Sequence, residues 1–155
     1  MGHKQIASAV LVLGMLGAGA VLAQDQPKAT GVVAVRQAAM KANGDHMAAI
    51  KAILTEYPEL IGQVEFHAEA VKETAEYAPT MFPPGSSQPA SSALPTVDSD
   101  QAGFKAASEK AEKLAEQLAD AAKGGDAKAT LAAFAALGKE GCGGCHETFR
   151  KKKDS

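Results

Sequence analysis

The chain has 155 residues and a formal net charge of -2, and 46% of its residues are hydrophobic, which suits one globular domain. Aromatic residues make up only 5% and Trp is absent, so a composition rich in alanine favours helices over a sheet core. The slightly acidic balance excludes the basic surface that nucleic-acid-binding proteins need.

Residues 1–23 are predicted to be a secretory signal peptide. Lys4 supplies a positive charge, an apolar stretch follows over 6–20, and Ala23 closes a small-residue cleavage site. The apolar stretch is shorter than the roughly 20 residues that a membrane span needs, and glycines interrupt it. We therefore expect a periplasmic protein whose mature domain, residues 24–155, is not inserted in the membrane.

Two amphipathic helices are predicted in the first half of this domain. Apolar residues recur at seven-residue intervals over 29–56, and Pro58 ends this first helix. Apolar residues spaced by three and four predict a second helix over 59–78, which Pro79 ends. Prolines and serines crowd residues 82–99, so this segment is expected to form one long connection.

Two further helices are predicted after that connection. Asp98 or Ser99 is expected to cap the third helix, and a pair of glycines ends it after residue 123. Its inward residues are expected to be Phe104, Ala107, Ala111, Leu114, Leu118 and Ala121. Asp126 is expected to cap the fourth helix, which extends to about Lys152. Its inward residues are expected to be Leu131, Phe134, Gly138, Cys142, Cys145 and Phe149.

The connections between these helices predict how they pack. Two of the turns are short and only one connection is long, so neighbouring helices are expected to run antiparallel. The sequence therefore predicts an all-α fold, an antiparallel up-down-up-down four-helix bundle.

The fourth helix contains the motif Cys142-Gly143-Gly144-Cys145-His146. This spacing is the attachment pattern of c-type haem, in which two thiols bond to the porphyrin and the adjacent imidazole reaches the iron. Residues three apart share a helix face, so both sulfur atoms can meet one edge of the macrocycle. The motif predicts one covalently attached haem c, with Cys142 and Cys145 as the attachment points and His146 as an iron ligand.

Other uses of a closely spaced cysteine pair are less consistent with this chain. A thioredoxin-like redox pair lies where a strand meets a helix, and the sequence shows no strand pattern. A zinc site needs four ligands, and the only other histidines of the mature chain, His46 and His67, have no finger-like spacing. A haem-free helical or metal-storage bundle stays open as a further class for as long as the two cysteines have not been shown to carry haem.

The chain resembles the class II cytochromes c, the cytochrome c-prime family. The resemblance is strongest over residues 141–151, which contain the attachment motif, and over residues 35–41 of the first helix. It implies that His146 is the proximal iron ligand, that Arg36 lies near a haem propionate and that Arg150 stands close to His146. The helical register agrees in part, since Arg150 follows His146 by four residues and Arg36 falls beside the inward line of the first helix.

The residue on the other side of the iron decides between two functions. Antiparallel packing places Met40 level with His146, whereas Met47 lies two turns further along the first helix, about 10 Å away. Met81, His46 and His67 are weaker candidates, the two histidines because they fall on or beside polar faces, and a core methionine is the plain alternative for Met40 itself. Residues 40–47 resemble the low-spin branch of the family, in which a methionine at this position ligates the iron.

We therefore expect a periplasmic electron carrier that exchanges one electron with redox partner proteins through a six-coordinate haem held by His146 and Met40. The alternative is a five-coordinate haem protein that binds nitric oxide or carbon monoxide, with Met40 only blocking the distal side. No nucleophile and base, phosphate loop or carboxylate pair is evident, so an enzyme is not expected. The family includes monomers and homodimers, and the sequence does not choose between them.

Overall fold

The computed structural model describes residues 28–86 and 90–152, and its first long element is helix α1, Gly31–Glu56. A 3-10 turn, η1 (Pro58–Leu60), follows because a proline cannot continue the helix. Helix α2 (Gln63–Tyr77) then returns along α1 and ends in a second 3-10 turn, η2 (Ala78–Met81). The predicted signal peptide lies outside the described residues.

A connection crosses one end of the bundle before the second pair of helices begins. It includes the single turn α3 (Thr96–Ser99) and leads into helix α4 (Gln101–Lys123). The last helical rod consists of three abutting segments, which are α5 (Ala127–Ala136), the π-helical segment η3 (Leu137–Gly143) and α6 (Gly144–Phe149). Asp126 caps α5 as predicted, because its Oδ1 accepts hydrogen bonds from the backbone N–H groups of Lys128 and Ala129.

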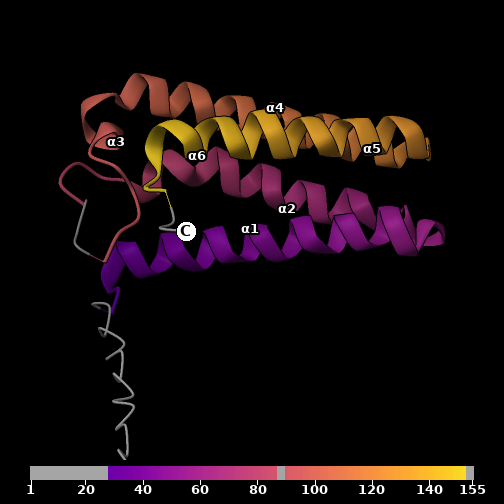
Figure 1. Cartoon of the computed structure of the whole chain (residues 1–155), viewed down its shortest axis with the longest axis horizontal. Coiled ribbons are helices and arrows are strands. Elements are labelled where there is room, and N and C mark those ends of the chain that lie inside the picture. Colours follow the sequence, from indigo (N-terminus) through magenta and orange to yellow (C-terminus); the bar gives the residue numbers. More distant parts are fainter. Residues whose placement is uncertain (1–27, 87–89, 153–155) are drawn as a thin grey trace, which may run out of the picture.

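The helices pack in chain order. Helix α2 lies against α1 on one side and α4 on the other, and α4 in turn packs against α5 and η3. Figure 1 shows the four rods side by side, with α3 and its loop gathered at the end where α1 starts and α6 finishes. This arrangement confirms the predicted up-down-up-down four-helix bundle. No helix in the described ranges is both long and apolar enough to cross a membrane.

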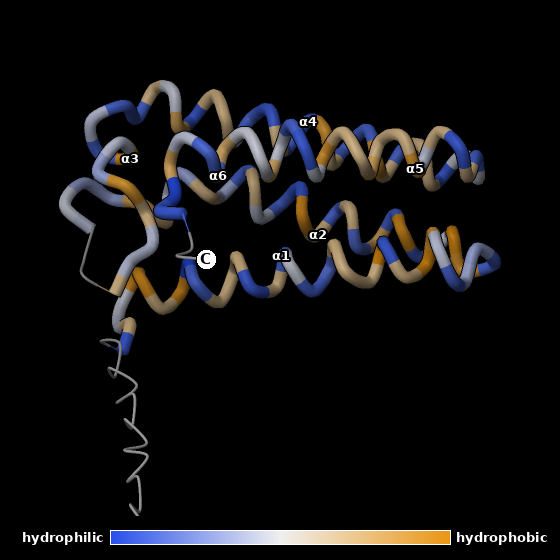
Figure 2. Tube along the Cα trace, viewed as in Figure 1, coloured by the Kyte–Doolittle hydropathy of each residue, from blue (hydrophilic) through white to orange (hydrophobic). Residues whose placement is uncertain are grey.

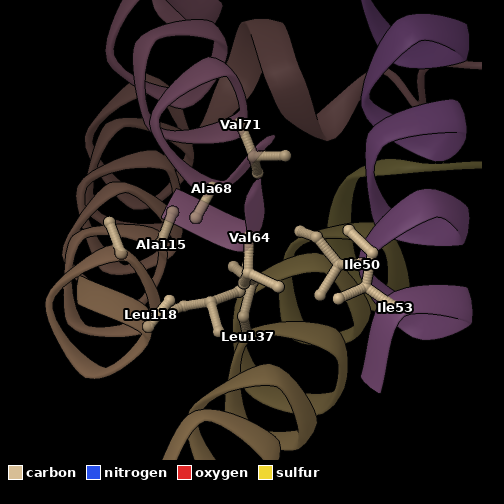
Figure 3. Close-up of a cluster of buried hydrophobic side chains, with 10 residues drawn as sticks. Ile50, Ile53, Val64, Ala68, Val71, Ala115, Leu118 and Leu137 are labelled. Atoms are coloured by element: carbon tan, nitrogen blue, oxygen red, sulfur yellow. The ribbon is translucent and has the colours of Figure 1, made fainter. Parts of the chain in front are cut away.

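The main core fills the half of the bundle away from that loop. Figure 3 shows its side chains pointing toward one another from α1, α2, α4 and η3. The buried members are Ile50, Ile53, Val64, Ala68, Val71, Ala115, Leu118, Ala119, Ala122 and Leu137. Along each rod hydrophobic and hydrophilic residues alternate with the turns of the helix, as Figure 2 shows. Burial of these apolar faces is what holds the helices together.

Three details of the predicted helices are wrong. Helix α4 is capped by Asp100, whose Oδ1 accepts a hydrogen bond from Gly103 N at 2.9 Å, because residues 96–99 coil into a turn of their own. The last helix ends at Phe149 instead of near Lys152. Leu131 was expected to face inward, yet 52% of its surface is exposed, and Thr130 is buried beside it instead.

The early end of the last helix has a direct cause in the loop. Arg150 adopts extended backbone angles and forms an isolated antiparallel bridge with Ala93. Leu94 N donates to Phe149 O at 2.9 Å, and Lys151 N donates to Ser92 O at 2.8 Å. The backbone groups that would have continued the helix are therefore paired with the loop.

Candidate functional site

A pocket of about 420 Å³ opens at the loop end of the bundle. Helix α1 contributes one wall and α6 contributes another, while the loop and the start of α4 complete it. Its lining residues are Arg36, Gln37, Met40, Lys41, Ala78, Phe82, Ser91, Ser92, Ala93, Val97, Phe104, Ser108, Cys145, His146, Phe149 and Arg150. Five of the six predicted site residues thus lie around one cavity, although they come from opposite ends of the sequence.

The sixth predicted residue, Cys142, lies one turn before the pocket. Its side chain packs partly buried against the main core, whereas Cys145 packs against a second apolar cluster made by Val97, Phe104 and Phe149. Both cysteines are free thiols. The two cysteines therefore lie one turn apart on the last helical rod, with Cys145 lining the pocket and Cys142 against the main core.

The chemistry of the two thiols differs from that of a redox-active pair. Burial raises the pKa of Cys142, and burial together with the neighbouring Cys142 raises the pKa of Cys145. A disulfide oxidoreductase needs the opposite, a thiol whose pKa is lowered so that the thiolate can attack. These raised pKa values argue against a catalytic dithiol.

Arg150 and His146 are close, but not for the predicted reason. The sequence placed them on one face of a continuous helix, whereas Arg150 lies beyond the helix in the extended bridge to Ala93. Both residues still line the pocket. Desolvation by the surrounding chain and the charge of Arg150 lower the pKa of His146, which favours the neutral imidazole that can bind a metal.

Arg36 of α1 is buried beneath the loop, with only 3% of its surface exposed. Its guanidinium donates to Ser86 Oγ at 2.9 Å, to Ser86 O at 2.7 Å and to Ser91 Oγ at 2.8 Å. The same group lies 4.5 Å from the ring centroid of Phe82, which is a cation–π contact. Burial lowers the pKa of Arg36, and Asp98 partly offsets this effect. Arg36 therefore ties the loop to α1 and at the same time contributes a positive charge to the pocket.

Loss of this anchor should be measurable as a loss of stability. A hydrogen bond to a charged group contributes about 1.5–3 kcal/mol, so we expect Arg36→Met to lower the free energy of unfolding by at least that amount. Gln37→Ala provides a matched control, because Gln37 holds the same loop through a single exposed hydrogen bond to Ala90 O. Urea unfolding should show little change for the control, and equal losses in both variants would contradict the anchoring role.

The other candidate ligands lie elsewhere. Met40 lines the pocket, whereas Met47 packs against the main core, where its methyl group approaches Gly138. Met81, His46 and His67 are not part of the pocket lining. Among the methionines and histidines considered from the sequence, Met40 is therefore the one that shares the pocket with His146.

Sequence reasoning missed part of the site. The loop contributes Ser91, Ser92 and Ala93 to the pocket. The path of this loop could not be predicted, because it has no periodic pattern of apolar residues. Asn43 is not part of the pocket lining, although its Oδ1 is a buried atom without a hydrogen-bond partner in the described part of the chain.

The residues present fit a covalently held haem. One thiol lies near the end of η3, and a second thiol and an imidazole follow on α6, which is the donor set for porphyrin attachment and iron ligation. The aromatic rings of Phe82, Phe104 and Phe149 give the pocket an apolar wall, and two arginines supply charge for carboxylates. The volume also lies within the ordinary range of ligand pockets.

Comparison with known proteins agrees with this chemistry. The family described as "Cytochrome C'" matches residues 31–150. The chain is 41% identical over 120 residues to cytochrome c' of Pararhodospirillum photometricum, covering 77% of this chain and 95% of that protein. It is 35% identical over 130 residues to cytochrome c-556 of Agrobacterium tumefaciens, covering 79% of this chain and 99% of that protein.

Solved structures lead to the same group. The bundle superimposes on a ferrous variant of cytochrome c prime from Alcaligenes xylosoxidans with bound NO, at a TM-score of 0.70 and 28% sequence identity. The match covers 79% of this chain and 94% of that one. The similarity therefore extends over most of this chain and nearly all of the solved one.

Proposed function

The chain belongs to the cytochrome c' family, which binds covalently attached haem c, and from that premise we propose that it is a five-coordinate haem protein that binds nitric oxide or carbon monoxide. This is the alternative that the sequence placed second. The names of the relatives favour it over the His146 and Met40 electron carrier, because most are called cytochrome c', and a related structure contains NO.

Each residue of the pocket has a distinct part in this proposal. Cys142 and Cys145 form the two thioether links, and His146 supplies the proximal nitrogen to the iron. Arg36 and Arg150 pair with carboxylates at the pocket edge. Haem iron, when bound, would supply a coordination position for a small gas. Met40 lines the same pocket from α1 and would restrict access of larger ligands to the iron.

The proposal also includes export of the chain to the periplasm. The leader predicted over residues 1–23 would deliver the chain to the periplasm, where c-type haem is attached in bacteria. The mature protein would then act there as a gas-binding or electron-transferring cytochrome, alone or as a homodimer.

The position of Met40 supports a second candidate function, that of an electron carrier. Its thioether shares the pocket with the His146 imidazole, so a six-coordinate haem that transfers one electron to redox partners is sterically conceivable. Visible and near-infrared spectra of the ferric and ferrous protein distinguish the two candidates. The proposal expects high-spin spectra and ready uptake of carbon monoxide, whereas a low-spin spectrum with a sulfur-to-iron band would establish the electron carrier.

Replacement of Met40 with alanine sharpens this test. If Met40 only crowds the distal side, Met40→Ala keeps the high-spin spectrum and accelerates carbon monoxide binding. Relief of the roughly 1–3 kcal/mol that crowding costs corresponds to about a 5- to 150-fold change. If Met40 is a ligand, the same variant instead converts a low-spin spectrum into a high-spin one. Met47→Ala, on the same line of α1 but in the core, should leave spectrum and binding rate unchanged.

A further inference from the structure

Two histidines face each other outside the pocket. His46 of α1 and His67 of α2 place their Nδ1 atoms 2.9 Å apart, with ring centroids 5.2 Å apart and planes tilted by 53°. Phe66 packs edge-on against both rings, at 6.3 Å from His46 and 5.3 Å from His67. Both histidines are half-buried in the seam between the two helices. Their orientation is therefore set by the surrounding residues before any ligand arrives.

This contact requires that the pair hold less than its full number of protons. One Nδ1 must donate and the other must accept, so at least one of the two rings is neutral. Burial lowers the pKa of His67, and the nearby His46 lowers it further. In the described ranges neither ring has a second hydrogen-bond partner. One Nδ1 therefore already presents a lone pair, and a metal bound at both Nδ1 atoms would displace the shared proton, to the Nε2 atom of the same ring or to water.

The acidic residues adjacent in sequence are engaged elsewhere. Asp45 forms an ion pair with Lys41, and Glu69 forms one with Lys72. No group of three or more His, Cys, Asp or Glu side chains suited to a metal occurs within residues 28–86 and 90–152. A metal at this pair would therefore have two protein ligands and complete its coordination with water.

We propose that His46 and His67 form a metal site on the α1–α2 seam that binds a divalent copper ion. Two nitrogens bonded at about 2.0 Å and at right angles to each other are about 2.8 Å apart, whereas tetrahedral zinc would hold them about 3.3 Å apart. The 2.9 Å between the two Nδ1 atoms is closer to the right-angle arrangement of tetragonal Cu(II). Copper also binds imidazole more tightly than the other divalent first-row metals.

The site is independent of the haem pocket. Neither histidine lines that pocket, and they lie on the two helices of the first hairpin and not on α6. A metal held by both rings would bridge α1 and α2 and bind the folded chain more tightly than the unfolded one, so it should raise the midpoint of thermal unfolding. Failure of this proposal would leave the gas-binding function untouched, and the reverse also holds.

Titration of the ferric holoprotein with Cu(II) tests the site, because ferric iron cannot reduce the added copper. We expect one copper per chain, with electron paramagnetic resonance showing coupling to two imidazole nitrogens. His46→Gln and His67→Gln should each weaken binding by at least about tenfold, since even second-shell partners of a metal contribute that much. Gln63→Ala, an exposed change one turn before His67, should bind copper like the unaltered protein.

Two results would overturn the proposal. One is a double variant, His46→Gln with His67→Gln, that binds copper as tightly as the unaltered protein while its haem spectrum is intact. The other is a copper signal from the unaltered protein that shows fewer than two imidazole nitrogens. The second measurement needs no variant, so it decides the matter even if a substitution prevents folding.

Discussion

Replacing Cys142 and Cys145 together with serine is expected to abolish covalent attachment of haem. A hydroxyl does not form the thioether link that the thiols make, and the two cysteines are the only ones in the sequence. The purified double variant should lose its haem on acid extraction and show the mass of the bare polypeptide. The unaltered protein from a host able to attach haem should retain its colour and show the added mass.

Single variants provide the internal control for this result. Cys142→Ser leaves Cys145 beside the pocket, and Cys145→Ser leaves Cys142 against the core, so each variant keeps one point of attachment. Both are expected to hold haem in reduced yield, with a pyridine haemochrome spectrum that reveals one unsaturated vinyl group. Haem that stays covalently bound to the double variant would remove the basis for assigning the motif.

The second large effect concerns stability. Leu118 is fully buried in the main core among residues of α2, α4 and η3, as Figure 3 shows. Leu118→Ala should therefore lower the free energy of unfolding by about 2–5 kcal/mol, since it removes buried apolar surface and leaves a cavity. Chemical unfolding followed by circular dichroism measures this difference directly.

Leu131→Ala is the matched control, because it makes the same chemical change at a position that the sequence also assigned to the interior. In the structure 52% of Leu131 is exposed, so the change should stay within about 0.5 kcal/mol. Similar losses at both positions would mean that Leu131 is covered in solution, for example by a second copy of the chain.

The arrangement of the site explains why one short motif can serve more than one function. His146 and the two cysteines are positioned by the last helical rod, so in the proposed haem site the half that they would form follows from local sequence. The distal half depends on what α1 places across the pocket, which here is Met40. Replacing that one side chain would change ligand access without altering the fold, and the Met40→Ala test depends on this separation.

The π-helical segment shows how the motif is held in place. Gly141 is buried where η3 crosses α4, and a Cβ atom there would come within 3.3 Å of the Ala111 backbone. The glycine thus allows the two rods to approach closely just before the first attachment cysteine. The spacing of apolar residues in this segment is that of a regular helix, so the sequence does not predict its π-helical form.

The sequence by itself determined the bundle and the chemistry of its last helix. The spacing of apolar residues, with prolines and glycines at the helix ends, located all four helical rods. The attachment motif identified the cofactor. Both kinds of information are local along the chain. Asp126 was identified as a cap for the same reason, because a cap depends only on its own helix start.

Only the tertiary structure decided what depends on contacts between distant segments. The bridge between Ala93 and Arg150 shortens the last helix, because backbone groups pair across the pocket and not along the helix. The burial of Arg36 requires serines about fifty residues away, and the His46–His67 contact requires two helices to pack in a particular register. Such contacts are set by the packing of whole faces, which no local pattern encodes.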